Sequence, residues 1–482
     1  VLLHPSSLPG PGYCGVLGAE ARRFVDLIAA AGIRIWQVLP LGPTHGDSCP
    51  YQSVSVHAGN LDLVDLYGLV EQGWLPEAEA AASGDDPDRK RRAVDLAGAV
   101  FFADRERDRR SPLALRYDTF LRETVAWLED YVRFEAFSEA FAAPSWSRWP
   151  RGLRDHQAAA CDRQAASLQE RIRAHRFRQF VFDCQWSELL AYARDQGVVL
   201  FGDIPIYVHL DSADVWANQA LFDLDDTGSP VTVTGVPPDY FSAEGQLWGN
   251  PQYAWQRLQA TGFDWWLQRF GSAARQFDIV RIDHFRALEA YWEIPASATS
   301  ARDGHWVKAP GEELLLAVRE RYPELALVAE NLGSITPEVE ALRHRFSLPG
   351  MLILQFAFDG NPENPYLLHN HSEGDVVYTG THDNNTTLGW FEELDAELAR
   401  GVYEYFGRPQ EPMPWMLVQQ AMKSPANTAI VPWQDFLGLD GDHRMNTPGT
   451  TEGNWEWRFD WGQVPSDLAL RIHGLLAATS RL

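Results

Sequence analysis

The chain has 482 residues, which suits about three domains or one large barrel with insertions. Its 45% hydrophobic and 22% charged residues are typical of a globular protein and exclude wholesale disorder. Its 41 basic and 66 acidic residues give a net charge of −25, which disfavours nucleic acid and anionic membranes as partners. No apolar run approaches the ~18 residues of a membrane helix, and the N-terminal segment has no basic flank, so we expect a soluble, cytoplasmic protein.

Short apolar runs that end in polar, Gly or Pro residues predict eight strands. In chain order they are Val1–His4, Ile33–Pro40, Val198–Val208, Phe277–Phe285, Leu325–Asn331, Met351–Phe358, Val376–Asp383 and Thr428–Gln434. Segments with helical periodicity, such as Glu20–Ala31 and Pro337–Arg345, lie between them. This alternation predicts an α/β fold, a (β/α)8 TIM barrel with inserted subdomains.

Two connections between predicted strands are too long for simple crossovers. Ala, Glu, Arg and Leu at helical spacing predict a mostly helical inserted subdomain over residues 69–178. The Gly, Pro and aromatic residues of 210–262 predict a loop-rich insertion. The barrel is then expected in three pieces, with strands 1–2 in residues 1–68, strand 3 in 179–209 and strands 4–8 in 263–482.

Two residue types bear on the class of protein. The four cysteines, which form no CxxC pair, argue against a zinc site or a redox motif and predict reduced thiols; they are Cys14, Cys49, Cys161 and Cys184. The 19 Trp are unusual: many can be core, but Trp in polar Gly, Pro and Asn loops is typical of sugar-stacking surfaces.

Charged residues end several predicted strands, at the edge where barrel enzymes carry their active sites. They are Asp203, Arg281, Asp283, Glu330, His382 and Asp383. Four carboxylates on one rim repel one another unless chemistry or nearby cations require them. Arg281 and Asp283 are two apart on one strand and face the same way, so the guanidinium can keep Asp283 ionised as a nucleophile.

Glu330 follows the apolar run LALVA, where partial desolvation favours the protonated form and suits a general acid. Glycosidic bond cleavage needs two carboxyls with opposite protonation states. The ionised one attacks the anomeric carbon, and the protonated one gives its proton to the departing oxygen. Asp383 is then expected to anchor sugar hydroxyls, with His284 and His382 as donors. Each residue alone also suits a turn, a helix cap or packing, but their joint occurrence predicts a site.

Three strand ends carry a resemblance to a known family: RIDHFR at Arg281–Arg286, AENLG at Ala329–Gly333 and TGTHDN at Thr379–Asn384. They resemble signature segments of the 4-α-glucanotransferases (amylomaltase or disproportionating enzyme, glycoside hydrolase family 77), relatives of the α-amylase clan. Further segments in the same order, such as GVPPDYFS, QLWGNP and RMNTPGT, extend the resemblance over nearly the whole chain, most weakly over the helical insertion. The resemblance implies transfer of an α-1,4-glucan segment to the 4-OH of an acceptor glucan or glucose, through a retaining double displacement.

Residue by residue, the resemblance assigns the nucleophile to Asp283, the acid/base to Glu330 and the transition-state stabiliser to Asp383. Asp203 and Arg281 match the pair that positions the nucleophile. The other matching residues are substrate-binding: Tyr51 under the cleaved sugar, Asp239, Tyr240, Phe241 and Trp248 in the acceptor-side loop, and the polar contacts Gln246, His284, His382 and Asn454. Retention predicts a separation of roughly 5–5.5 Å between the carboxyls of Asp283 and Glu330.

The chain departs from the family pattern at Asn331 and Asn385, where Asp is common, and at His45, where Tyr is usual. An amide in place of a carboxylate beside Glu330 removes a like charge, so we expect a changed protonation preference there. Two alternatives stay open: an α-amylase-type hydrolase that uses the same carboxylates with water as acceptor, and a catalytically silent glucan-binding module. We expect maltooligosaccharides and α-1,4-glucans as partners, no metal or organic cofactor, and a monomer or weak homodimer.

Overall fold

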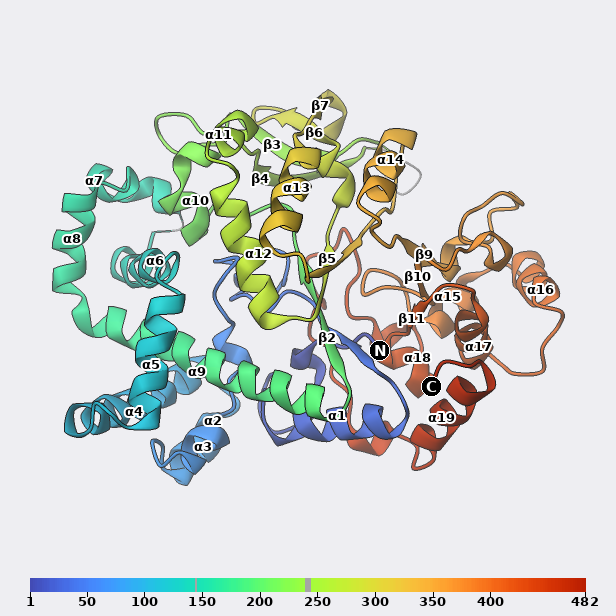
Figure 1. Cartoon of the computed structure of the whole chain (residues 1–482), viewed down its shortest axis with the longest axis horizontal. Coiled ribbons are helices and arrows are strands. Elements are labelled where there is room, and N and C mark those ends of the chain that lie inside the picture. The colour runs from blue at the N-terminus through green and yellow to red at the C-terminus, as the bar shows by residue number, and fades with distance from the viewer. Residues whose placement is uncertain (144, 239–243) are drawn as a thin grey trace.

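The computed structural model describes residues 1–143, 145–238 and 244–482. In this part of the chain, parallel strands form two sheets at the centre of the molecule (Figure 1). The first sheet has the order β1-β2-β5-β8, with strands Ile35–Gln37, Val199–Ile204, Ile279–Ile282 and Ala326–Ala329. The second has the order β11-β10-β9, with strands Thr428–Ile430, Val376–Tyr378 and Met351–Ile353.

The N-terminal segment joins the two sheets on one side. Leu2 makes parallel bridges to Gln37, the last residue of β1, and to Pro432 beyond β11. On the other side the amide of Ala329 donates to the carbonyl of Pro349, just before β9, at 2.9 Å. Within the described residues, the parallel segments therefore follow the predicted order around a TIM-barrel-like fold, and this prediction is confirmed.

Apolar side chains fill the space that the parallel strands surround. The buried ones are Leu2, Leu39, Phe201, Val328, Met351, Ile353, Val376, Tyr378, Ile430 and Met445. Because side chains alternate along a strand, residues two positions after Phe201 and Val328 point to the same side as these two. These positions are Asp203 and Glu330, which places charged side chains at the C-terminal end of a packed core.

Helices occupy most of the described residues between β1 and β2, and they project to one side of the barrel (Figure 1). The helix α1 (Ala19–Ala30) precedes β1. The helices between β1 and β2 are α2 Leu66–Glu71, α3 Glu77–Ser83, α4 Pro87–Arg107, α5 Pro112–Glu123, α6 Leu128–Phe141, α7 Arg151–Arg154, α8 Ala158–Ser167 and α9 Gln169–Asp195. Local sequence explains why α4 begins where it does. The Asp86 carboxylate accepts hydrogen bonds from the amides of Asp88 and Arg89, and Pro87 occupies the first helical position. The expected boundary between residues 178 and 179 falls inside α9, because this helix runs on to the segment just before β2.

An antiparallel sheet with the order β4-β3-β6-β7 lies above the barrel in Figure 1. Its strands are β3 Thr232–Val236, β4 Gln246–Pro251, β6 Ala290–Pro295 and β7 His305–Lys308. We did not predict β3 and β4, which lie in the segment expected to be loop-rich together with α10 (Ala213–Ala217) and α11 (Trp255–Ala260). Glycines inside both strands weaken the strand pattern, and β6, which pairs with β3 on the side away from β4, lies outside the segment.

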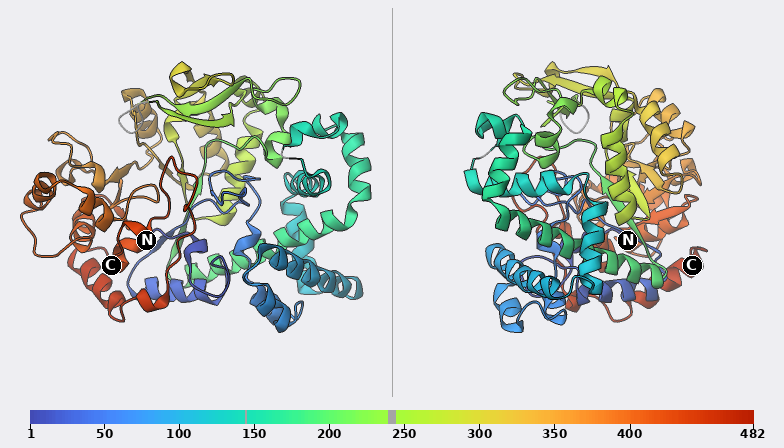
Figure 2. Two further views of the ribbon diagram at one scale, coloured as in Figure 1. Left: turned by 180° about the vertical axis from the view of Figure 1, so that it is seen from behind. Right: turned by 60° about the vertical axis from the view of Figure 1, so that its left-hand side comes forward.

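The remaining helices cover the outside of the barrel (Figure 2). They are α12 Asp264–Gln276, α13 Gly311–Arg321, α14 Pro337–Arg345, α15 Thr387–Glu393, α16 Ala396–Tyr405, α17 Trp415–Lys423, α18 Trp433–Leu437 and α19 Leu468–Ala478. The two chain ends lie near one another in both views of Figure 2. Across the described residues, none of the helices combines the length and apolar character that a membrane crossing needs.

Candidate active site

Arg281 is the centre of a charged group at the ends of β2 and β5. Its guanidinium contacts Asp203 Oδ2 at 2.5 Å and Asp283 Oδ1 at 3.0 Å. The Tyr51 hydroxyl donates to the same Asp203 oxygen at 2.7 Å. The Arg281 and Asp203 side chains are only 5% and 0% exposed, so this ion pair is a buried anchor for Asp283.

Backbone amides hold the Glu330 carboxylate at the end of β8. Oε2 accepts from the amide of His284 at 2.6 Å, and Oε1 accepts from the amide of Leu332 at 2.8 Å. His284 has a positive φ of 47°, which is unusual for a residue other than glycine. The amide of Phe285 donates to the Glu330 carbonyl at 3.1 Å, so the segment after β5 fixes both the backbone and the side chain of Glu330.

Asp383 follows β10 and is held from two sides. His382 Nε2 lies 3.3 Å from Asp383 Oδ2, and Asn446 Nδ2 donates to Asp383 Oδ1 at 2.6 Å. Arg444 donates to the Asp383 carbonyl at 3.0 Å. The Tyr51 ring stacks on His382 with 5.2 Å between centroids, which links Asp383 to the Arg281 group.

Burial sets the protonation of these carboxyls. It raises the pKa of Asp283 to about 7, against the opposing charge of Arg281 and with the like charges of Asp203 and Glu330 adding to the rise. It also raises the pKa of Glu330. We expect from the sequence that Arg281 keeps Asp283 ionised, but in the free site burial outweighs the charge of Arg281 and raises the pKa of Asp283.

Asp383 differs from this pair. The Asp383 side chain is half exposed at the cavity wall. Its partial loss of water contact by itself raises the pKa, but the charge and hydrogen bond of His382 and the hydrogen bond of Asn446 outweigh this effect and lower the pKa to about 2. Asp383 therefore stays ionised over the whole range in which the other two carboxyls titrate.

A cavity of about 660 Å³ brings most of the predicted residues together. Those that line it are Tyr51, Gln246, Trp248, Arg281, Asp283, His284, Glu330, His382, Asp383 and Asn454. Asp203 is not among the lining residues and contacts Tyr51 and Arg281 instead. The predicted loop residues Asp239, Tyr240 and Phe241 lie outside the described residues.

Two of the expected sugar contacts already have protein partners. Trp248 packs edge-on against His284, with 4.9 Å between centroids, and its Nε1 donates to Gln246 Oε1 at 3.0 Å. Asn454 Oδ1 accepts from the amide of Thr447 at 2.8 Å, and Asn454 Nδ2 donates to the carbonyl of Thr450 at 3.0 Å. The side chain of Asn454 thus braces a turn at the cavity wall.

Sequence reasoning missed several residues of the cavity wall, including Asn446, Trp306 and Trp455. Two of them are Trp in polar loops or edge strands. The high Trp content of the chain indicates sugar-stacking surfaces in general, but it does not show which Trp residues form them. Asn446 lies in RMNTPGT, one of the segments that carry the resemblance, but nothing in the sequence pairs it with Asp383, which is 63 residues away.

The two Asn residues that depart from the family pattern each bind a Glu of the helix that follows. Asn331 Nδ2 donates to Glu340 Oε1 at 2.9 Å, and Asn385 Nδ2 donates to Glu393 Oε1 at 2.8 Å. A carboxylate cannot donate such a bond, so the amides suit these neighbours.

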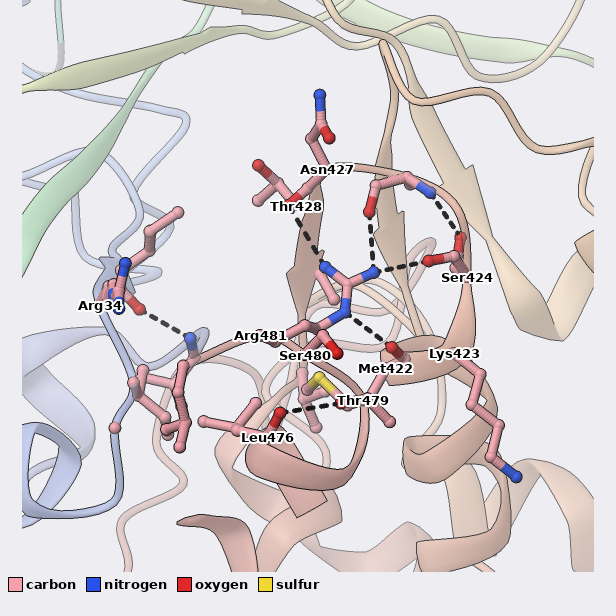
Figure 3. A pocket seen from close by; sticks show the side chains of 18 of the residues that line it. Arg34, Met422, Lys423, Ser424, Asn427, Thr428, Leu476, Thr479, Ser480 and Arg481 are labelled. Atoms are coloured by element: carbon pink, nitrogen blue, oxygen red, sulfur yellow. Dashed lines mark hydrogen bonds between the residues drawn. The ribbon is translucent and has the colours of Figure 1, made fainter. Parts of the chain in front are cut away.

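A second cavity, of about 700 Å³, lies at the N-terminal ends of β1 and β11, beside both chain ends (Figure 3). Arg481 dominates it, and its guanidinium donates to four backbone carbonyls, those of Met422, Ser424, Ala426 and Asn427. None of the described side chains that line it is a carboxylate, so only the first of the two cavities has the carboxyl groups that acid/base chemistry needs.

In the described part of the chain, no three His, Cys, Asp or Glu side chains are grouped as a metal site.

Comparison with known proteins agrees with the site. The family model for 4-alpha-glucanotransferase matches residues 3–463. The chain belongs to the 4-alpha-glucanotransferase family. The 4-alpha-glucanotransferase of Thermus thermophilus is 46% identical, with 100% of this chain and 98% of the relative aligned, and that of Synechocystis is 44% identical over 96% and 94%.

Solved structures of amylomaltases share the fold of this family member. The amylomaltase of Streptococcus agalactiae in complex with acarbose matches with a TM-score of 0.94 at 35% identity, over 100% of this chain and 99% of that one. The amylomaltase of Corynebacterium glutamicum matches with a TM-score of 0.76 at 18% identity, over 100% and 75%, and supports the fold alone.

Proposed function

We propose that the protein is a 4-alpha-glucanotransferase that moves a segment of an α-1,4-glucan to the 4-OH of an acceptor glucan or glucose. The observation that carries this proposal is the meeting of Asp283, Glu330 and Asp383 in one cavity, with raised pKa values in the first two and a lowered pKa in the third. Its relatives are named 4-alpha-glucanotransferases, and the Streptococcus agalactiae structure holds acarbose.

The first step forms a glycosyl ester. Glu330 in its protonated form gives its proton to the glycosidic oxygen while the Asp283 carboxylate attacks the anomeric carbon. The C–O bond of the donor breaks, and the released segment leaves with the proton. Positive charge that develops on the sugar ring lies beside Asp383, which stays ionised and lowers the energy of the transition state.

The second step transfers the sugar. Glu330, now a carboxylate, takes the proton from the 4-OH of the acceptor, whose oxygen attacks the anomeric carbon, and the ester bond to Asp283 breaks. Two inversions at the anomeric carbon retain its configuration. Water in place of the acceptor sugar would make the same site a hydrolase of the α-amylase type.

Incubation with pure maltotriose separates transfer from hydrolysis. Transfer produces both shorter and longer oligosaccharides while the number of reducing ends stays constant, because each broken bond is replaced by a new one. A rise in reducing ends without longer products would overturn the proposal in favour of the hydrolase. A protein that binds maltotriose without any product would be a glucan-binding module.

We further propose a cytoplasmic protein that acts on neutral α-1,4-glucans and maltooligosaccharides, as a monomer or weak homodimer. All four cysteines are free, which suits a reducing compartment. The net charge of −25 suits a neutral partner better than nucleic acid.

A further inference from the structure

Trp306 is an exposed aromatic residue on the rim of the catalytic cavity. It lies on β7, the edge strand of the antiparallel sheet, and it is 39% exposed although it is a large apolar side chain. The ring lines the cavity that holds Asp283 and Glu330. An exposed indole on a cavity wall has surface available for a ligand.

Two neighbours contact the Trp306 ring, and one of them, Arg286, also lines the cavity. The guanidinium carbon of Arg286 lies 3.6 Å from the ring centroid, over one face of the indole. Trp292 meets the ring edge-on, with 4.9 Å between centroids and an angle of 68°. The orientation of the indole is therefore fixed before any sugar binds, which lowers the entropy cost of stacking on it.

A series of contacts leads outward from Glu330 to Trp306. Next to the catalytic carboxylate, His284 donates its amide to Glu330 Oε2. Further along the same two segments, the guanidinium of Arg286, two residues after His284, donates to the carbonyl of Ser334, four residues after Glu330. Trp306 lies over Arg286, beyond this second contact. It is thus on the side of the cavity where the acid/base stands, the side of the departing and the accepting sugar.

We infer that Trp306 is a sugar-stacking residue of an outer acceptor subsite, occupied by a glucosyl unit beyond the one whose 4-OH reacts. This inference rests on the proposed function. Aromatic rings bind the apolar faces of pyranose rings by burial and dispersion. Free glucose fills only the inner acceptor position, so Trp306 favours oligosaccharide acceptors over glucose.

The test compares acceptors in the full-length enzyme with a fixed donor. Maltotriose and glucose are varied as acceptors against wild type, Trp306→Ala and Trp306→Phe, with labelled acceptor to follow each product. We expect the KM for the maltotriose acceptor to rise about 5- to 10-fold in Trp306→Ala, with the KM for glucose and the kcat unchanged. Trp306→Phe keeps a flat ring and is expected to recover most of the loss.

Two further variants make the result decisive. Trp306→Leu keeps apolar packing on Trp292 without a flat ring, so it gives the same comparison if the Ala variant does not fold. Tyr405→Ala removes an aromatic residue of α16 that is 37% exposed and not among the cavity residues, and it should change neither KM.

Unchanged KM values in the Trp306 variants, or an equal rise for glucose and maltotriose, would overturn the inference, because a purely structural role acts on all acceptors alike. Failure of the proposed function looks different: the wild-type enzyme would then transfer sugar to neither acceptor.

Discussion

Asp283 lies 3.0 Å from the Arg281 guanidinium, yet burial raises its pKa to about 7. The same guanidinium also faces Asp203 at 2.5 Å, so one cation is shared by two carboxylates. In the free site, Arg281 therefore compensates the negative charge of Asp283 only in part. In the proposed mechanism, the positive charge that develops at the anomeric carbon supplies this compensation, so the arrangement would favour the transition state over the free site.

Removal of the proposed nucleophile should stop turnover. Asp283→Asn has nearly the same shape but cannot form the glycosyl ester, and we expect maltotriose disproportionation to fall by at least about 10³-fold. Binding of maltotriose, measured by calorimetry, should persist because the cavity is intact. Rates near those of the wild type would contradict the assignment of Asp283.

The raised pKa of Asp283 makes a prediction for stability. The folded chain binds a proton at Asp283 more tightly than the unfolded chain does, so this group stabilises the fold at low pH. That stabilisation is lost as the pH rises from the ordinary value of 3.8 through about 7. Asp283→Asn cannot ionise, so its Tm relative to wild type should increase by at least about 2 °C between about pH 4.5 and about pH 8. A difference that stays constant or shrinks would show that the pKa is not raised.

Asn446 should be a positioning residue for Asp383. Asn446→Ala removes the 2.6 Å hydrogen bond to Asp383 Oδ1, and hydrogen bonds to charged groups contribute about 1.5–3 kcal/mol. We expect kcat to fall roughly 10- to 100-fold with a smaller change in KM. The pKa of Asp383 should rise, because its carboxylate loses one of the contacts that lower it.

Asn446→Asp is the matched comparison. It keeps the shape but places a second carboxylate against Asp383, so its loss of kcat should exceed that of the Ala variant. Equal, small effects in both variants would indicate that Asn446 does not act through Asp383.

The buried pair of Arg281 and Asp203 should show strong coupling in unfolding experiments. Arg281→Met leaves the Asp203 carboxylate, 0% exposed, without its cation and should lower the free energy of unfolding by about 3–5 kcal/mol. Asp203→Asn removes the charge that is left behind. Denaturant unfolding of the double variant should therefore show a loss smaller than the sum of the two single losses, whereas additive losses would contradict the pairing.

The sequence predicted the barrel and the carboxylates that meet in the cavity because both depend on local patterns. Buried parallel strands are apolar runs, and Asp283 or Glu330 is visible as the polar residue that ends such a run. Strands β3 and β4 escaped prediction because a glycine interrupts each of them and because β6, the second partner of β3, lies outside the segment. The contact of Asn446 with Asp383 and the raised pKa of Asp283 depend on residues that only folding brings together.

The most direct test of the account is to trap the glycosyl ester on Asp283. An α-maltosyl fluoride donor has a leaving group that needs little help from an acid, so a Glu330→Gln variant can form the ester but lacks the base that would transfer it onward. Digestion and mass spectrometry of this variant should find the peptide that contains Asp283 heavier by one maltosyl unit. A maltosyl unit on another residue, or an unlabelled protein that still consumes the fluoride, would contradict the proposed double displacement through Asp283.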